Sequence, residues 1–296
     1  MESNGNGFKK GLHFLEPPKR VVSLVPSMTE SMFDLGFGQA LVGITDYCIH
    51  PEQSLRELPR LGGPKNPNLG DIIDLHPDLV LANQEENVPA AVHALESAGI
   101  KVWVTFPKTV RQSLDILWTL TGLFHSETAA VRLEILERTL EWAQMACQER
   151  QPLPYFCPIW QEIVPDGQTW WMTFNQDTYC SDLLAQMGGS NVFASRQRRY
   201  PLAADLGQAE PQDAPGRDVR YPRVRLQEIL GSRPEVILLP SEPYAFSDFD
   251  QGQILDWMAD TPAVKSGRVH RVDGSLITWH GTRLGLALDA LQPLFA

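Results

Sequence analysis

Residues 68–83 read NLGDIIDLHPDLVLAN, and residues 225–241 read RLQEILGSRPEVILLPS, about 157 positions later (225 − 68). Each stretch begins with a short segment of helical character that carries an acidic residue and pairs of Ile or Leu. A Pro then ends the helix, because the residue before a proline disfavours the helical conformation. The aliphatic run that follows has no polar alternation, which is typical of a strand buried on both faces of a parallel sheet. The two stretches therefore predict equivalent elements in two related halves of the chain.

Strands and helices are expected to alternate through both halves. The strands are predicted at residues 21–25, 41–45, 79–82 and 101–105, and again at 154–160, 191–194, 236–239 and 267–272. Such alternation requires right-handed crossovers and gives parallel sheets covered by helices on both faces. The sequence thus predicts an α/β fold with two pseudo-symmetric, Rossmann-like lobes and a ligand cleft between them, since small ligands usually bind between lobes.

A long helix is predicted between the halves. Residues 125–152 are rich in Ala, Leu and Glu, which are strong helix formers, and Ser126-Glu127 is a helix start signal. One unbroken helix of about 25 residues would be roughly 37 Å long. The predicted organisation is an N-terminal arm (1–19), an N-terminal lobe (20–124), a linker helix (125–151) and a C-terminal lobe (152–296).

The bulk composition excludes some partners. The 296 residues carry a net charge of −11 with a pI near 5.1, which argues against nucleic acid and against an anionic membrane surface. No signal peptide and no apolar run of membrane-spanning length is recognised, and the four cysteines lack CxxC spacing. A cytoplasmic location is expected, or a periplasmic or surface-attached one if a leader has been removed.

Several stretches resemble one protein family. RVVSLVPSMTESMFDLG (20–36), the first repeat copy and the single long helix are similar to periplasmic binding proteins for cobalamin and ferric siderophores, and most of all to the cobalamin-binding components of ABC importers. The resemblance implies a non-catalytic binder that holds a corrinoid or related metal-bearing macrocycle as its ligand, without a cofactor of its own. The cleft of this family accepts corrinoids, haem and siderophores. The implied partner is the membrane subunit of an importer.

The same resemblance indicates docking residues. In importer components an exposed Glu stands seven residues before the Pro of each repeated motif. Gly70 and Gln227 occupy these positions here, and acidic residues follow one position later, at Asp71 and Glu228. A shift of one residue turns a helical side chain by about 100°. Asp71 and Glu228 are therefore weak candidates for docking.

Candidate ligand-binding residues share a place at the carboxyl ends of predicted strands, where parallel sheets bind ligands. They are Ser27, Tyr47, Lys65, Asn66, Asn83 and Glu85 in the first half, and Trp171, Phe174, Glu242, Tyr244, Trp279, His280 and Arg283 in the second. By the resemblance, Tyr47 lies where a cleft Tyr contacts the corrin, and Asn83 replaces an aromatic residue. Ser27 and Glu30 also have the spacing of a helix capping box.

Three of these candidates have two interpretations each. Trp170–Phe174 follows a predicted Pro-Asp-Gly turn (165–167) and is expected on a loop, where its rings stack on a macrocycle or fill the core of the lobe. His280 is expected at the start of the last helix, where the dipole favours the neutral imidazole, either as a ligand to metal or amide or as a cap. Arg283 pairs either with an anionic group of the ligand or with an acid of the protein.

Two further hypotheses stay open. Glu85, Glu242 and His280 could act as acid and base in a cytosolic enzyme for an amide- or phosphate-bearing substrate. No nucleotide, serine-hydrolase or metal motif supports such an enzyme, and no metal site is predicted. The basic cluster Arg196–Tyr200, within the polar segment 195–224, either selects anionic ligands or is solvated.

Overall fold

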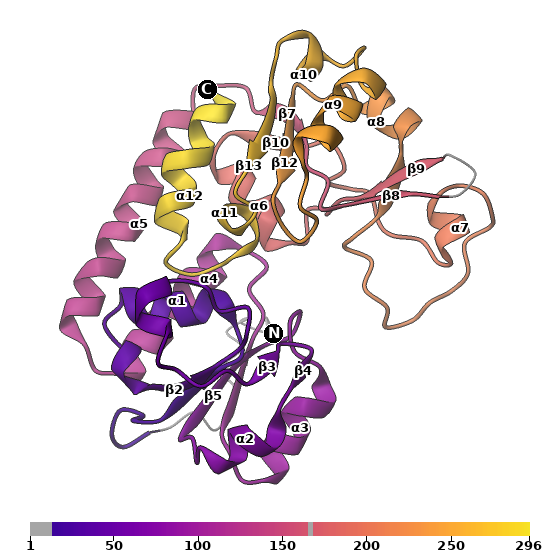
Figure 1. Cartoon of the computed structure of the whole chain (residues 1–296). Helices are drawn as coiled ribbons and strands as arrows, with labels where there is room; N and C mark the ends of the chain where they lie inside the picture. Colours follow the sequence, from indigo (N-terminus) through magenta and orange to yellow (C-terminus); the bar gives the residue numbers. More distant parts are fainter. Residues whose placement is uncertain (1–13, 165–167) are drawn as a thin grey trace, which may run out of the picture. The chain divides into compact units, whose positions relative to one another are not determined.

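The computed structural model describes residues 14–164 and 168–296 (Figure 1). The chain divides into two compact units. Unit 1 comprises the described part of Met1–Pro107, together with Ser113–Ile135 and Gly281–Arg283. Unit 2 comprises Lys108–Gln112, Leu136–His280 and Leu284–Ala296. Each unit is therefore completed by segments that are distant in the sequence.

Unit 1 is built on a parallel sheet of four strands in the order β2-β1-β5-β6. Its elements are β1 (Val21–Ser23), α1 (Pro26–Asp34), η1 (Gly38–Ala40), β2 (Leu41–Ile44), η2 (Glu52–Leu55), the antiparallel pair β3 (Gly62–Gly63) and β4 (Asn66–Pro67), α2 (Leu69–Asp74), β5 (Leu79–Asn83), α3 (Pro89–Ser97) and β6 (Val102–Thr105). Strand β5 is the aliphatic run of the first repeat copy. All five of its residues are buried, as expected for a strand between two neighbours with helices on both faces.

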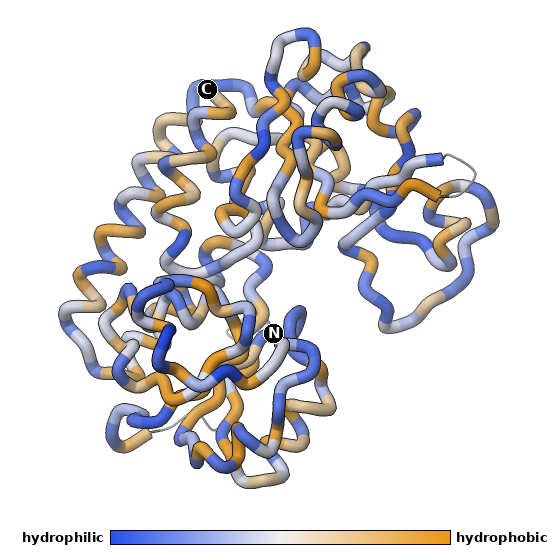
Figure 2. The backbone as a smooth tube through the Cα atoms, viewed as in Figure 1, coloured by the Kyte–Doolittle hydropathy of each residue, from blue (hydrophilic) through white to orange (hydrophobic). Residues whose placement is uncertain are grey.

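Unit 2 contains a second parallel sheet, in the order β10-β7-β12-β13. Its elements are β7 (Leu153–Phe156), α6 (Tyr179–Gln186), β10 (Gly189–Asn191), α7 (Leu202–Asp205), α8 (Leu226–Ser232), β12 (Val236–Pro240), α9 (Asp248–Trp257), α10 (Pro262–Lys265), β13 (Val269–Val272), α11 (Ser275–Thr278), α12 (Leu284–Leu291) and η3 (Gln292–Phe295). Strand β12 is the second repeat copy, and its neighbours β7 and β13 correspond to β1 and β6. The predicted pair of related α/β lobes is therefore confirmed. Figure 2 shows β12 as mainly apolar and many connecting loops as hydrophilic.

The two repeat copies also share their backbone geometry. Both α2 and α8 end before the proline, and the residue preceding it is left-handed in each copy, with φ of 45° at His76 and 50° at Arg233. The amide after the proline then bonds to the neighbouring strand region, from Asp78 N to Arg20 O and from Glu235 N to Pro154 O, both at 2.7 Å. The repeat thus encodes the helix end and the register of the following strand together.

The long helix is present but shorter than predicted. After α4 (Val110–Leu123), α5 extends over Glu127–Cys147, which is 21 residues rather than about 25. Its predicted start is confirmed, because Ser126 Oγ accepts a hydrogen bond from Ala129 N at 3.2 Å. Helix α5 contributes Glu127–Ile135 to unit 1 and the remainder to unit 2. Among the described residues, no helix has the length and apolar character needed to span a bilayer.

A second sheet in unit 2 was not predicted. Strands β8 (Trp160–Ile163), β9 (Thr169–Met172) and β11 (Arg223–Arg225) form an antiparallel sheet in the order β11-β9-β8. The aromatic stretch expected on a loop is therefore largely a strand, and the strand predicted at 154–160 divides into β7 and the start of β8. The strand predicted at 191–194 lies earlier, at β10. The predicted turn at 165–167 and most of the N-terminal arm lie outside the described residues.

Candidate functional site

Asn87 connects three segments at the carboxyl end of the unit 1 sheet. Its buried side chain donates hydrogen bonds from Nδ2 to Leu24 O (3.3 Å) and to Pro64 O (3.0 Å), and its Oδ1 accepts from Asn83 N (2.7 Å). The end of β1, the β3–β4 turn and the end of β5 are thereby fixed to one another. Asn87 was not among the sequence candidates, and its place shortly after the first repeated strand was the only signal for it.

Four predicted residues meet around these segments. Asn83 is buried, and its Oδ1 accepts from Glu85 N at 2.7 Å. Lys65, in the β3–β4 turn, donates from Nζ to the backbone carbonyl of Glu85. The exposed ring of Tyr47 lies against Gly63, where an added Cβ would be 3.6 Å from the ring. The structure therefore brings Tyr47, Lys65, Asn83 and Glu85 together at one surface of unit 1.

Asn66 lies in the same β3–β4 turn as Lys65, next to Gly63. It is exposed on β4, and its Oδ1 lies 2.8 Å from the position that a Cβ on Gly63 would take. A side chain at position 63 would therefore displace Asn66, and the absence of one keeps the turn close to Tyr47.

The prediction for Ser27 is wrong in its local structure. Helix α1 begins at Pro26, its N-cap residue Val25 makes no side-chain capping bond, and Ser27 lies inside the helix, buried. A proline at the first helical position needs no amide partner, which explains why the helix begins two residues earlier than the capping box predicted. Ser27 contributes its carbonyl, which accepts from Ser31 Oγ at 2.8 Å.

Unit 2 carries an aromatic pair at the corresponding end of its sheet. The rings of Trp160 and Tyr244 meet edge to face at 5.6 Å, and Trp160 is 38% exposed. Tyr244 is predicted, whereas Trp160 was missed because it stands at the end of a run interpreted as one strand. The neighbouring Glu242 accepts from Thr278 Oγ1 at 2.7 Å. An exposed indole beside a phenol and a carboxylate offers both a flat apolar surface and polar atoms.

A buried hydrogen-bond network supports this pair. Trp171 Nε1 donates to Gln161 Oε1 (2.7 Å), Gln161 Nε2 donates to Asp250 Oδ1 (3.3 Å), and Tyr244 Oη donates to the same Oδ1 (3.2 Å). Burial acts to raise the pKa of Asp250, but hydrogen bonds, led by those from Ser247, hold that pKa below its usual value. The network therefore favours the ionised carboxylate, which fixes the Tyr244 hydroxyl.

Direct ligand contact by Trp171 and Phe174 is wrong as a prediction. Both side chains are 0% exposed, and Trp171 lies in the core cluster with Phe156, Val224 and Ile237. On β9 the side chains alternate, so Trp171 points to the core, and its indole N–H is satisfied there by Gln161. The alternative that these rings fill the core of the lobe is the one the structure supports.

The last three candidates lie near the start of α12. Trp279 is partly buried, and His280 is buried between α11 and α12 with its ring 6.2 Å from that of Tyr179. Burial lowers the pKa of His280 to about 4. The imidazole is thus neutral as predicted, but the cause is desolvation rather than a helix dipole, because α12 begins only at Leu284. A buried imidazole is not placed to ligate the metal of a ligand at the surface.

Arg283 forms an ion pair with the protein itself. Its Nε lies 2.8 Å from Glu30 Oε2, and the two side chains are 5% and 10% exposed. Burial raises the pKa of Glu30, although Arg283 acts in the opposite direction. The predicted pairing with a ligand anion is therefore replaced by the structural salt bridge that was its alternative.

The two weak docking candidates stand at the third position of their helices. Asp71 Oδ2 accepts from Asn68 Nδ2 at 2.6 Å, and Glu228 Oε1 accepts from Arg225 N at 3.2 Å. Glu228 also pairs with Arg196 at 3.3 Å. Carboxylates in a first turn stabilise the helix through its unpaired amides. Both acids thus have a local role, and docking by them stays a prediction.

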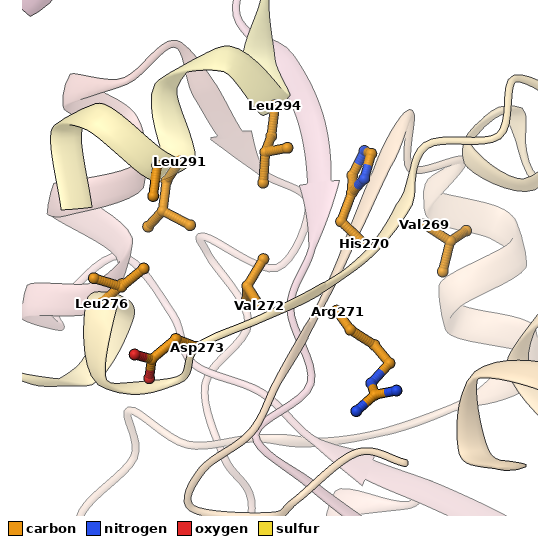
Figure 3. A pocket seen from close by; sticks show the side chains of 9 residues that line it. Val269, His270, Arg271, Val272, Asp273, Leu276, Leu291 and Leu294 are labelled. Atoms are coloured by element: carbon orange, nitrogen blue, oxygen red, sulfur yellow. The ribbon is translucent and has the colours of Figure 1, made fainter. Parts of the chain in front are cut away.

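A cavity of about 440 Å³ lies along β13 of unit 2 and does not involve the predicted residues. In Figure 3, Val272, Leu276, Leu291 and Leu294 point toward a common space, and Arg271 points away. No group of three or more His, Cys, Asp or Glu residues within 14–164 and 168–296 is placed to hold a metal ion.

Replacing Asn87 with Ala is expected to lower the free energy of unfolding by about 2 kcal/mol, because the amide of Asn83 and two carbonyls lose a buried partner. Urea denaturation of the purified variant measures the loss. Asn66→Ala removes an exposed amide in the β3–β4 turn and is the matched control. It should lower the free energy of unfolding by less than about 0.5 kcal/mol. Equal losses for the two variants would contradict the connecting role of Asn87.

Comparison with known proteins places this architecture in a family. The model of the family described as periplasmic binding protein matches residues 21–276. A vitamin B12-binding protein of Vibrio cholerae serotype O1 is 24% identical over 277 residues, which cover 93% of this chain and 87% of the relative.

Two solved structures have a similar fold. The periplasmic vitamin B12-binding protein of Vibrio cholerae aligns with a TM-score of 0.73 at 22% identity, covering 94% of this chain and 97% of that chain. A periplasmic haem-binding protein from Pseudomonas aeruginosa aligns with a TM-score of 0.69 at 21% identity, covering 94% and 92%. The family match spans most of the chain and both repeat copies, and it confirms the resemblance found in the sequence: the chain belongs to the periplasmic binding protein family.

Proposed function

We propose that this protein binds a corrinoid without catalysis, as the substrate-binding component of an ABC importer. The observation that carries the proposal is the nearly full-length match to vitamin B12-binding proteins. The exposed Tyr47 of unit 1 and the Trp160–Tyr244 pair of unit 2 supply the chemistry that such a ligand needs.

The aromatic residues suit a large ring system. A macrocycle that covers a Tyr or Trp ring removes apolar area from water at about 25 cal/mol per Å², so a few rings contribute several kcal/mol. Three polar side chains at the unit 1 surface, the ammonium of Lys65, the amide of Asn66 and the carboxylate of Glu85, supply partners for the polar rim of the ligand. Ligand contact by these residues is part of the proposal.

Haem is the second candidate ligand. Its support is the fold similarity to haem-binding proteins from two bacteria, Pseudomonas aeruginosa and Vibrio cholerae. A corrin and a porphyrin are both flat metal-bearing macrocycles, so the aromatic surfaces alone do not distinguish them. The enzymatic alternative gains no such support, since His280 is buried and Glu242 is engaged with Thr278.

Delivery to a membrane partner completes the proposal. Several of the similar solved structures are periplasmic proteins, and we infer that this chain too serves an importer from outside the cytoplasm. The cytoplasmic location expected in the sequence analysis stays a prediction. Labelling of whole cells with a membrane-impermeant reagent separates the two locations.

The ligand is tested by titrating the purified protein with cobalamin, cobinamide, haem and a ferric siderophore, followed by visible absorption and equilibrium dialysis. Micromolar or tighter corrinoid binding, about −8 kcal/mol or better, is expected. Tyr47→Ala should weaken it at least tenfold, which is about 1.4 kcal/mol. Trp142→Ala removes an exposed aromatic of α5 outside both surfaces and is the matched control. Failure to bind any of the four ligands would remove the proposed function.

A further inference from the structure

The segment 196–225 of unit 2 is basic within an acidic protein. It contains seven arginines, out of 25 Lys and Arg residues in the chain, and four acids, so its local charge is +3 (7 − 4) against −11 for the whole sequence. Two of these arginines have carboxylate partners. Arg196 lies 3.0 Å from Asp205, and Arg220 pairs with Asp218 at 2.6 Å.

Two other arginines lie over the ring of Tyr200, and a third, Arg223, lies over the ring of Trp170. The guanidinium of Arg198 lies 4.2 Å from the centre of the Tyr200 ring, and that of Arg217 lies 5.0 Å from it. The guanidinium of Arg223 lies 5.9 Å from the centre of the Trp170 ring, and its Nη1 donates to Tyr221 O at 2.9 Å. Burial lowers the pKa of Arg223 and the positive charge of Arg198 adds to that effect, although Asp205 acts in the opposite direction. Within 14–164 and 168–296, no carboxylate forms an ion pair with the side chain of Arg198, Arg217 or Arg223.

The backbone holds these like charges together. Asp205, whose side chain is 0% exposed, accepts from Arg199 N (2.9 Å) and from Arg223 N (2.8 Å), and so joins the two ends of the segment. Tyr200 Oη donates to Asp218 O at 2.7 Å, which fixes the ring on which the arginines stack. Like charges repel, so a flexible loop would separate them, whereas this framework keeps them in place.

The geometry of Tyr200 points to a binding site. Nε of Arg223 is buried and has no hydrogen-bond partner in the described part of the chain. Guanidinium groups present planar pairs of N–H donors that match the oxygens of carboxylate and phosphate, and an anion would relieve the repulsion among them. We propose that Arg198 and Arg217, which lie over the Tyr200 ring, bind a small oxyanion, either a phosphate or a carboxylate, with Arg223 as a third donor. The proposal is independent of the ligand proposed above.

The test is calorimetric titration of the whole protein with inorganic phosphate, pyrophosphate and citrate at low ionic strength. Saturable binding with one site is expected for at least one of them. The double variant Arg198→Gln/Arg217→Gln should lose at least tenfold in affinity. The charge-matched control Arg56→Gln/Arg150→Gln changes the same number of charges at two exposed positions outside the segment and should keep the wild-type affinity.

A further variant and further probes separate the possible outcomes of this titration. Arg217→Lys keeps the charge and removes the planar fork, so an intermediate affinity supports the site, and it provides a readout if the double variant does not fold. Glycerol phosphate compared with inorganic phosphate shows whether the anion is free or carried by a larger molecule, and binding of either supports the site. The proposal is overturned by absence of saturable binding to every probe, by equal losses in the test and control variants, or by binding only to RNA or anionic vesicles.

Discussion

Replacing Arg283 with Met is expected to lower the free energy of unfolding by about 3–5 kcal/mol, because it leaves the buried carboxylate of Glu30 without its partner. The loss is expected to shrink as the pH is lowered toward the raised pKa of Glu30, since the protonated acid has no charge to compensate. Urea denaturation at neutral and mildly acidic pH measures both effects.

The double variant Glu30→Met/Arg283→Met is the control for this ion pair. Removing both charges avoids the buried unpaired carboxylate, so the double variant should be clearly more stable than Arg283→Met alone. A double variant that is no more stable than the single one would show that Arg283 acts through packing rather than through Glu30.

Acidification is expected to destabilise the protein through His280. The pKa of this side chain is about 4 in the folded protein and 6.5 in the reference state, so its contribution is complete above pH 6.5 and is lost as the pH falls toward 4. The difference between these two pKa values corresponds to about 3 kcal/mol of unfolding free energy, since one pKa unit is about 1.4 kcal/mol. Acid destabilises the folded protein because the unfolded chain, in which His280 has the higher pKa, binds the proton first and is stabilised by it.

Substitution of His280 by Phe isolates this effect. The variant cannot bind a proton at this position, so the difference in unfolding free energy between it and the wild type should change by about 3 kcal/mol between pH 6.5 and 4. His93→Gln removes an exposed imidazole and serves as the control. A pH profile of His280→Phe parallel to that of the wild type would contradict the assignment.

The parallel sheets were predictable because their signal is long and repeated. An aliphatic run after a proline has one consistent interpretation, and its second occurrence in β12 supported the first in β5. The antiparallel sheet lacked such a signal. Its strands have three or four residues, and β11 pairs with β9 across about 50 positions that include α6, β10 and α7, so no local pattern indicates the pairing.

The candidate site was predicted as a location more accurately than as a set of contacts. Tyr47, Lys65 and Glu85 were selected as candidates at strand ends, and the structure places them near one another in unit 1; ligand contact by them stays a prediction. The burial of the two adjacent tryptophans, Trp170 and Trp171, did not follow from the sequence, since their stretch was expected on a loop and not in β9. Arg283 shows the same limit, because its partner Glu30 stands 253 positions earlier.

The segment Gly281–Arg283 has a consequence for biosynthesis. Gly281 N bonds to Ser113 Oγ at 2.8 Å, Thr282 Oγ1 bonds to Asp34 Oδ2 at 2.6 Å, and Arg283 pairs with Glu30, so three late residues complete the packing of unit 1. At roughly 5–20 residues per second, a ribosome needs roughly 7–30 s to synthesise the chain between Ile135 and Gly281. During that time the carboxylate of Glu30 lacks the guanidinium of Arg283. The N-terminal unit therefore finishes folding only after residues 281–283 have been synthesised.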